Sequence, residues 1–129
     1  MKIEHIAIWA SDIELLKFFY IKYFDCKAGN KYINKVKLFE SYFLEFDSGC
    51  RLELMKKPDI PKNLNDIFTQ YLGFIHIAIS VGSKIKVDVL TERIREDGYI
   101  IVGEPRYTGD GYYESCVLDP DGNRIEITI

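Results

Sequence analysis

An α+β fold built from two similar βαβββ modules is predicted by an internal repeat and by the periodicities around it. The tetrapeptide H-I-A-I occurs twice, at residues 5–8 and 76–79. The segment G-C-R-L-E-L at 49–54 is repeated as G-N-R-I-E-I at 122–127, in the same order and at nearly the same offset. Because both similarities keep one order and spacing, we infer that the chain contains a duplicated module.

The first module begins with a strand and a helix. Residues 2–9 alternate apolar and polar side chains, as a half-buried strand does. The sequence S-D-I-E at 11–14 is a capping-box pattern that opens a helix, and residues 25–29 end it. Helical spacing gives this helix an apolar face, made of Leu16, Phe19, Tyr20, Tyr23 and Phe24. Alternation then predicts three strands, at 27–33, 36–47 and 51–55.

The second module repeats this order. A strand at 74–81 leads to a helix that Ser83 opens and Gly98 closes. Three strands follow, near 99–103, 112–118 and 124–129. Since half of this chain would bury too little surface to fold alone, we expect one domain, residues 1–129, with module 1 at about 1–55, a linker at about 56–73 and module 2 at about 74–129.

Composition and charge exclude several classes of protein. The 129 residues include 17 basic and 20 acidic side chains, and the net charge of −3 is too mild to indicate a partner. The lysines are scattered and not massed on one stretch, which argues against a nucleic-acid binder. No apolar run reaches the roughly 20 residues that a membrane span requires, and the N-terminus lacks the features of a signal peptide. The three cysteines form no disulfide or zinc-knuckle pattern. We therefore expect a cytoplasmic protein that binds neither nucleic acid nor membranes.

Two histidines and two glutamates occupy matched positions in the repeat. Strand alternation places the neighbouring isoleucines and leucines against the helices and these four residues on the opposite face. Two carboxylates in apolar surroundings repel each other unless a cation neutralises them. Two nitrogen and two oxygen donors suit a divalent ion such as Ni²⁺, Zn²⁺, Mn²⁺, Co²⁺ or Fe²⁺. The sequence therefore predicts a metal site on the concave face of a curved sheet, with the ligands His5, Glu53, His76 and Glu126.

Further residues are candidates for binding a substrate. Trp9 shares the predicted strand face of His5, and two arginines flank the glutamates with the same parity, where they could pair with them or meet an anionic substrate. The glycine-rich stretch 103–114 predicts either a mobile flap over the metal or an ordinary hairpin with aromatic cross-strand packing. The candidate substrate-binding residues are Trp9, Arg51, Arg106, Tyr107, Tyr113 and Arg124.

These motifs resemble the vicinal oxygen chelate superfamily, which includes glyoxalase I, fosfomycin-resistance proteins, methylmalonyl-CoA epimerase, extradiol dioxygenases and bleomycin-resistance proteins. The resemblance covers essentially the whole chain and is carried by I-E-H-I-A-I, R-L-E-L, F-I-H-I-A-I and the closing L-D-P-D-G-N-R-I-E-I, which is the most specific. It implies paired βαβββ modules that cup a metal in a cup-shaped curved sheet. It also implies a homodimer, with the site built within one chain or by exchange of modules between two chains.

The ligand order His, Glu, His, Glu resembles bacterial glyoxalase I. This resemblance implies a lyase of the lactoylglutathione lyase kind, acting on the hemithioacetal of methylglyoxal or a similar small oxygen-chelating substrate through a metal-stabilised enediolate. Glu126 is then the catalytic base and Glu53 its pseudosymmetric catalytic partner. Trp9 and Lys57 stand where that enzyme holds glutathione with arginine and asparagine, so the co-substrate is either glutathione or another thiol.

The same resemblance leaves other activities open. A non-catalytic, ligand-sequestering protein of the bleomycin-resistance kind is one alternative. Metal-dependent thiol transfer, epimerisation and dioxygenation are the others.

Overall fold

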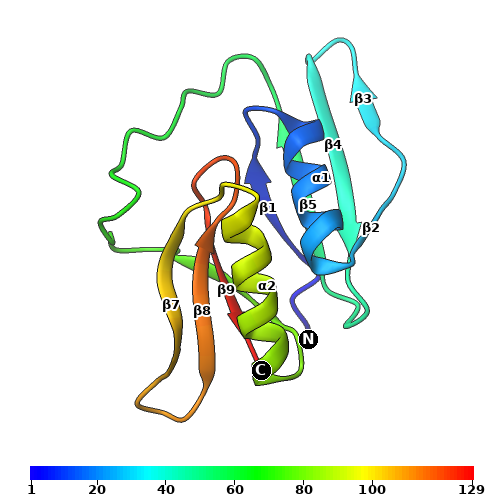
Figure 1. Ribbon diagram of the computed structural model, residues 1–129. Helices are drawn as coiled ribbons and strands as arrows, with labels where there is room; N and C mark the ends of the chain where they lie inside the picture. The colour runs from blue at the N-terminus through cyan, green and yellow to red at the C-terminus, as the bar shows by residue number, and fades with distance from the viewer. The chain divides into compact units, whose positions relative to one another are not determined.

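The computed structural model describes residues 1–129, which form two compact units, residues 1–64 and 65–129. Each unit contains one helix and one sheet, in both cases with the helix packed against one face of its own sheet (Figure 1). The predicted α+β class and its two modules are confirmed. That the two units act as a single domain stays a prediction.

The first unit runs β, α and then the remaining strands of one sheet. Its elements are β1 (His5–Trp9), α1 (Ile13–Phe24), β2 (Lys27–Ala28), β3 (Tyr32–Asn34), β4 (Phe39–Glu45) and β5 (Arg51–Lys56). The sheet order is β1-β5-β4-β2, with β3 also pairing with β4. β1 and β5 are parallel, whereas the other pairs are antiparallel. The first and last strands of the module are therefore neighbours.

The second unit has the same arrangement. Its elements are β6 (His76–Ser80), α2 (Lys84–Glu96), β7 (Ile101–Tyr107), β8 (Tyr113–Leu118) and β9 (Arg124–Thr128). The sheet order is β6-β9-β8-β7, and β6 and β9 are again parallel. The last strand of this module therefore also lies beside the first.

Helix caps and buried side chains explain where the helices form. The carboxylate of Asp12 accepts hydrogen bonds from the backbone N–H groups of Glu14 and Leu15, at 3.0 and 3.1 Å, and so caps α1. Ser83 caps α2 in the same way through the N–H of Lys86. Each helix covers the buried face of its sheet, where Leu54 and other apolar side chains are fully enclosed. Alternation along the strands then leaves the opposite face of each sheet to polar and aromatic groups.

Two predicted strands of the first module differ from the structure. The expected strand 36–47 begins only at Phe39, because residues 35–38 form a turn. The side-chain oxygen of Asn34 accepts the backbone N–H of Lys37 at 3.0 Å, and Leu38 has a φ of 50°. The expected strand 27–33 is divided into β2 and β3. A local side-chain to backbone hydrogen bond therefore outweighs the strand-like alternation here.

The stretch 103–114 forms a hairpin. β7 continues to Tyr107, and the loop closes with a hydrogen bond of 2.8 Å from the backbone N–H of Thr108 to the carbonyl of Tyr112. The rings of Tyr107 and Tyr113 pack across the two strands with centroids 4.8 Å apart. Of the two alternatives for this stretch, the structure shows the hairpin.

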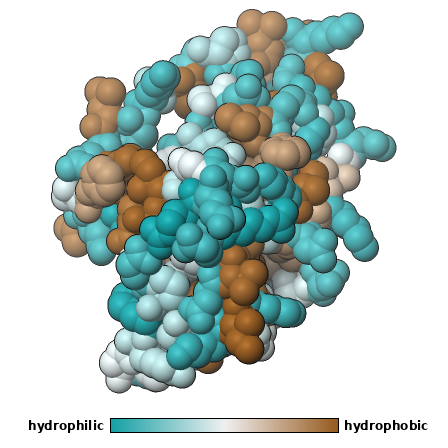
Figure 2. Space-filling model, in the orientation of Figure 1, coloured by the Kyte–Doolittle hydropathy of each residue, from teal (hydrophilic) through white to brown (hydrophobic).

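The surface mixes hydrophilic and hydrophobic residues, with no large area of either kind alone in the view of Figure 2. Exposed apolar side chains occur on both helices, among them Phe18 on α1 and Ile85 on α2. Neither helix has the length and apolar character needed to cross a membrane.

Candidate functional site

His5 and Glu53 form a pair on the face of the first sheet that α1 does not cover. They lie on the neighbouring strands β1 and β5, where Ala7 is in register with Glu53. The distance from His5 Nε2 to Glu53 Oε2 is 3.8 Å. The ring of Phe43 meets the imidazole edge to face, with centroids 5.4 Å apart. The histidine side chain is 39% exposed and the glutamate 15%, so the pair is open on one side.

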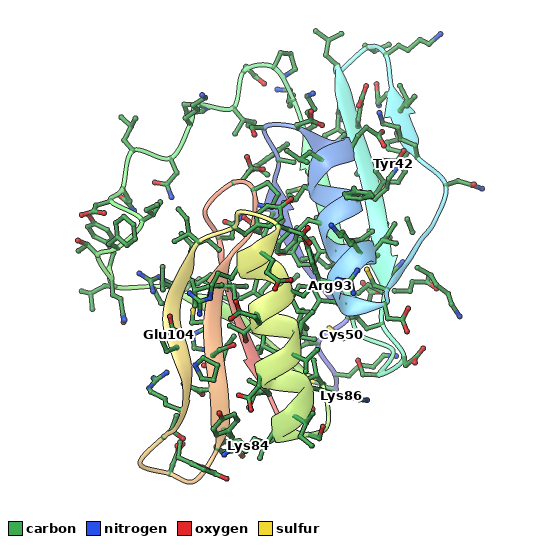
Figure 3. All side chains as sticks on the ribbon, in the orientation of Figure 1. Tyr42, Cys50, Lys84, Lys86, Arg93 and Glu104 are labelled. Carbon is green, nitrogen blue, oxygen red and sulfur yellow. The ribbon has the colours of Figure 1, made fainter.

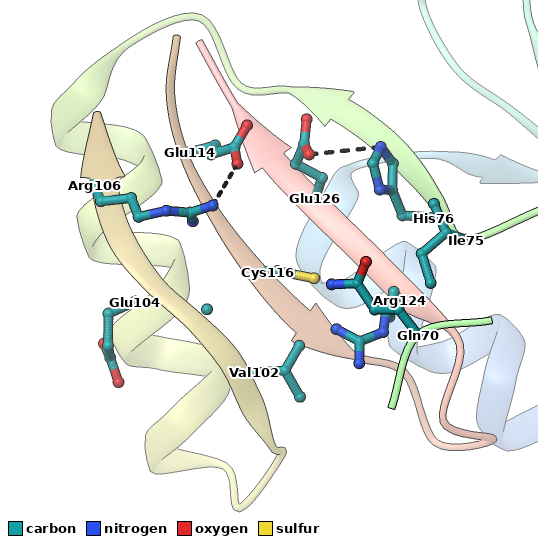
Figure 4. A pocket seen from close by; sticks show the side chains of 11 residues that line it. Gln70, Ile75, His76, Val102, Glu104, Arg106, Glu114, Cys116, Arg124 and Glu126 are labelled. Carbon is teal, nitrogen blue, oxygen red and sulfur yellow. Dashed lines mark ion pairs between the residues drawn. The ribbon is translucent and has the colours of Figure 1, made fainter. Parts of the chain in front are cut away.

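His76 and Glu126 form the equivalent pair in the second unit. They lie on β6 and β9, where Ala78 is in register with Glu126. His76 Nε2 is 3.5 Å from Glu126 Oε2, the contact drawn as a dashed line in Figure 4. The register of this pair is the same as that of His5 and Glu53. The repeat seen in the sequence is therefore also a repeat in geometry.

Each pair fits a divalent metal ion as half of a ligand set. Two donors bound to one tetrahedral zinc ion at about 2.0 to 2.2 Å lie about 3.4 Å apart. The distances of 3.8 and 3.5 Å are close to that value and need only small side-chain rotations. No group of three or more His, Cys, Asp or Glu side chains is arranged to hold a metal ion. A four-ligand centre therefore stays a prediction, which requires one pair from each unit.

The imidazole of His5 has a second partner that the sequence did not indicate. The carboxylate of Glu4 contacts Nδ1 of His5 and also pairs with the guanidinium of Arg51. The hydrogen bond from His5 and then that from Arg51 lower the pKa of Glu4 from its ordinary value. Arg51 also lies over the ring of Phe43, with its guanidinium carbon 4.1 Å from the centroid.

His76 and Glu126 lie in a pocket of about 490 Å³ within the second unit. Charged groups face it from β7, β8 and β9 (Figure 4). Arg106 Nη2 is 3.2 Å from Glu114 Oε1. Partial burial, followed by the charge of Glu114, raises the pKa of Glu126, while His76 and Arg106 act in the opposite direction. The lining residues are Gln70, Ile75, His76, Val102, Gly103, Glu104, Arg106, Glu114, Cys116, Arg124 and Glu126.

Four of the predicted substrate-binding residues lie on the same sheet faces as the His and Glu pairs. Trp9 is 41% exposed and packs edge to face on Phe39, with centroids 6.2 Å apart. Arg51 is held by Glu4. Arg106 and Arg124 line the pocket, and Arg124 also donates to the carbonyl oxygen of Ile67 at 2.8 Å.

Tyr107 and Tyr113, the other two predicted substrate-binding residues, lie on the opposite face of the second sheet from His76 and Glu126. Tyr113 is buried, and its hydroxyl donates to Asp88 of α2 at 2.7 Å, which raises its pKa to about 12. The ammonium of Lys84, labelled in Figure 3, lies 5.1 and 4.6 Å from the centroids of the two rings. These tyrosines attach the hairpin to α2, and neither lines the pocket.

Glu114 and Cys116 are pocket residues that the sequence analysis missed. Both lie on β8, where Tyr113, Ser115 and Val117 are buried against α2. Alternation alone would have placed Glu114 and Cys116 on the face of Glu126, since Cys116 is in register with it. This alternation was not used in the sequence analysis, because the preceding glycine-rich stretch is too irregular for a regular strand.

The chain matches known proteins over nearly its full length. Residues 2–127 match a family model described as the Glyoxalase/Bleomycin resistance protein/Dioxygenase superfamily. A crystal structure of a mutant glyoxalase I from Zea mays has a TM-score of 0.80 and 25% sequence identity, over 98% of this chain and 44% of that one. A glyoxylase/bleomycin resistance protein/dioxygenase domain from Frankia sp. EAN1pec has a TM-score of 0.82 and 18% identity, over 100% of this chain and 97% of that one.

A relative in sequence is the uncharacterized protein YqjT of Bacillus subtilis (strain 168), 34% identical over 59 residues, which are 43% of this chain and 46% of that protein. The matched regions therefore span less than half of this relative and of the maize enzyme. Proteins of the matched superfamily are generally metal-dependent, commonly form dimers and bind small molecules. With residues 2–127 matched and the fold shared, the chain belongs to the Glyoxalase/Bleomycin resistance protein/Dioxygenase superfamily.

Proposed function

We propose that this protein is a metal-dependent lyase of the glyoxalase I kind, acting on the hemithioacetal of methylglyoxal or a similar small substrate with adjacent oxygens. The observation that supports it is the repeated His and Glu pair. His5 and Glu53, and His76 and Glu126, stand in the same register on equivalent strands, with donor atoms 3.8 and 3.5 Å apart. A homodimer and a cytoplasmic location are part of the same proposal.

The four residues would hold one divalent cation, with Nε2 of each histidine and a carboxylate oxygen of each glutamate as donors. When bound, the cation supplies Lewis acidity, which makes the hydrogen on the carbon next to a substrate carbonyl more acidic. The protein must then provide a base at that carbon. Glu126 is our choice, because it lies in a pocket of about 490 Å³ with space for a small substrate, beside Glu114 and Arg106.

The reaction is an isomerisation in which every atom is retained. The carboxylate of Glu126 accepts the proton from the carbon that bears the sulfur and returns it to the neighbouring carbonyl carbon. The hydroxyl proton passes to the other oxygen, so the hemithioacetal becomes a hydroxy thioester without an external oxidant or reductant. One carboxylate can perform both transfers, because it is a base before the first step and an acid after it.

Binding groups for the rest of the substrate lie on both sheets. Arg106 and Arg124 line the pocket and can each pair with a carboxylate of the thiol. Trp9 offers an exposed aromatic face on the first sheet. Because Trp9 and Lys57 replace the expected glutathione contacts, we leave the thiol open between glutathione and another small thiol.

The test is an isomerase assay with hemithioacetals of methylglyoxal and several thiols, across a panel of divalent metals. The protein is purified without an affinity tag or chelator, and its metal content is measured in parallel. We expect thioester formation that a chelator abolishes and an added metal restores. Protein that binds no transition metal and forms no thioester from any thiol would contradict the proposal.

Ligand sequestration is a second candidate, supported by the aromatic row on the first sheet. The ring of Phe39 lies between those of Trp9 and Tyr32, with its centroid 6.2 Å from that of Trp9 and 6.1 Å from that of Tyr32. Trp9 and Tyr32 are both exposed, so an aromatic ligand could stack against them. Tight binding of an aromatic ligand by metal-free protein, measured by tryptophan fluorescence, would favour this candidate. Loss of that binding on addition of a metal would favour the lyase.

A further inference from the structure

The carboxylate of Glu4 lies between the imidazole of His5 and the guanidinium of Arg51, at the edge of the first sheet. Its two carboxylate oxygens have different partners: one contacts Nδ1 of His5, and the other pairs with the guanidinium of Arg51. Arg51 is 47 residues away in the chain and is itself placed over the ring of Phe43. Glu4 is therefore held on one side by Arg51 and can orient the imidazole on its other side.

This contact decides which nitrogen of His5 carries the proton. A carboxylate that is paired with a guanidinium accepts hydrogen bonds and donates none. The contact at Nδ1 therefore favours the tautomer in which Nδ1 of His5 donates, which leaves a lone pair on Nε2. Nε2 is the nitrogen that faces Glu53, at 3.8 Å. The tautomer fixed by Glu4 is therefore the one that a metal ligand at Nε2 needs.

We propose that Glu4 is a positioning residue, which holds His5 in the orientation and tautomer that present Nε2 to a divalent cation, with Arg51 holding Glu4 in turn. This inference rests on the proposed metal site and goes beyond its four ligands. Partners of this kind on the second nitrogen of a metal-binding histidine typically change metal affinity by 10- to 100-fold.

The second unit provides an internal reference. Ile75 precedes His76 at the position equivalent to Glu4, and the ion pair of His76 is made by Nε2 with Glu126. Arg124, equivalent to Arg51, donates instead to the carbonyl oxygen of Ile67. The orienting carboxylate is thus a property of the first unit, and removing it should alter one histidine and leave the other unchanged.

The experiment measures tautomer and metal affinity in Glu4→Ala and Glu4→Gln. Proton–nitrogen correlation spectra of the metal-free protein near pH 8 report the tautomer, and the chain has only two histidines to distinguish. We expect His5 to move from the Nδ1–H form towards the Nε2–H form in Glu4→Ala, with His76 unchanged. Competition for Zn²⁺ against a chromophoric chelator should show about a tenfold loss of affinity. Glu4→Gln keeps an acceptor oxygen and should lie between Glu4→Ala and the wild type.

Two further variants separate positioning from simple charge. Glu40→Gln removes a carboxylate from the other face of β4 in the same sheet, where it pairs with Lys31, and should leave both the tautomer and the affinity unchanged. Arg51→Met removes a positive charge near the site, so electrostatics alone would strengthen cation binding. Positioning predicts the opposite result, since Glu4 loses the group that holds it.

The inference and the proposed function can fail separately. If Glu4→Ala leaves the His5 tautomer and the Zn²⁺ affinity at wild-type values, Glu4 has no positioning role and the inference is overturned. Tighter Zn²⁺ binding in Arg51→Met would also overturn it. Wild-type protein without measurable affinity for any divalent cation would instead overturn the proposed function. The two failures can be told apart, because the tautomer spectra are recorded without metal.

Discussion

The two units present the same pair of side chains in different surroundings. In the first unit, the ring of Phe43 lies beside His5, and Trp9 and Phe39 pack together on the same face. In the second unit, Glu114 and Arg106 lie beside Glu126 on the pocket wall. The two units therefore share the positions of the histidine and the glutamate but differ in the side chains around them. We expect the first sheet to bind apolar parts of a substrate and the second to bind charged groups and move protons.

The largest expected difference between the units concerns their glutamates. Glu126→Gln should lower kcat at saturating metal by about 100-fold or more, because it removes the proposed base. Glu53→Gln should act mainly through metal affinity, so that added metal restores much of the activity. Steady-state kinetics across a metal titration measures both effects.

The matched control for these glutamate variants is Glu92→Gln, on the exposed side of α2, which should keep wild-type kinetics. Equal loss of kcat in Glu53→Gln and Glu126→Gln would show that the two halves share the chemistry.

The next largest expected effect is on the free energy of unfolding, and it tests whether the two units unfold together. Leu54 and Ile127 occupy equivalent positions of the repeat and are fully buried. Truncating either to alanine leaves a cavity and should lower the free energy of unfolding by about 2 to 5 kcal/mol. If the units form one domain, urea unfolding of each variant stays a single transition at lower midpoint. Two transitions, each moved by only one of the variants, would show that the units unfold independently.

The helix of the second unit is joined to its sheet by a buried pair of hydroxyls. The hydroxyls of Thr91 and Ser115 lie 2.6 Å apart, and Thr91 also lies 2.7 Å from the carbonyl oxygen of Val87. Thr91→Val should lower the free energy of unfolding by about 1 to 3 kcal/mol, since it leaves the Ser115 hydroxyl without this partner. Adding Ser115→Ala should recover part of that loss. A double variant less stable than the sum of the two single changes would contradict this explanation.

The helix of the first unit is joined to its sheet by charged groups instead. Glu14 of α1 accepts from the hydroxyl of Tyr42 at 3.0 Å and pairs with Lys17 and Lys31 (Tyr42 is labelled in Figure 3). The bond from Lys17 is the main cause that lowers the pKa of Glu14 from 4.5 to about 2. A carboxylate with a lowered pKa stabilises the fold above pH 4.5, and this contribution is lost as the pH falls towards 2.

Glu14→Gln should therefore remove part of the acid sensitivity of folding between these two pH values. The effect is small, because the Glu14 side chain is 52% exposed and solvent screens its partners. The measurement is the free energy of unfolding against pH, with Glu45→Gln as the control. Parallel curves for wild type and Glu14→Gln would show that this network contributes nothing to acid stability.

Periodicity was sufficient for the fold class and for the sheet faces on which the predicted metal ligands lie. Alternation along β1 and β5 placed His5 and Glu53 opposite the apolar residues, and the structure has them on that face. Periodicity first failed where a side chain bonds to the backbone. Asn34 accepts the N–H of Lys37 and turns the chain where the pattern favoured a strand. The N-cap of α1 also differs by one residue, because the capping-box pattern favours Ser11 and the structure has Asp12.

Periodicity also failed to predict the contacts of residues outside the regular strands. Glu4 precedes β1, and its parity would have grouped it with Ile6 on the helix side. Only the pairing with Arg51 across the sheet shows its contact with His5. For Tyr113, the glycine-rich neighbourhood left a flap and a hairpin open, and only the bond of its hydroxyl to Asp88 of α2 shows how it is held. Tertiary contacts of this kind have no signal in a single sequence.

The length of the connector between the units bears on whether the proposed metal site is built within one chain or between two. Its later part is anchored to the second unit, where Ile67 accepts a hydrogen bond from Arg124. Only residues 57–66 then separate the end of β5 from this anchor, and ten extended residues reach at most about 33 to 36 Å. If the proposed four-ligand site joins one pair from each unit, a tether this short would give the units of one chain an effective concentration in the millimolar range for each other. Exchange between two chains would then lose the competition as the protein is diluted, so low concentration would favour the proposed site within one chain.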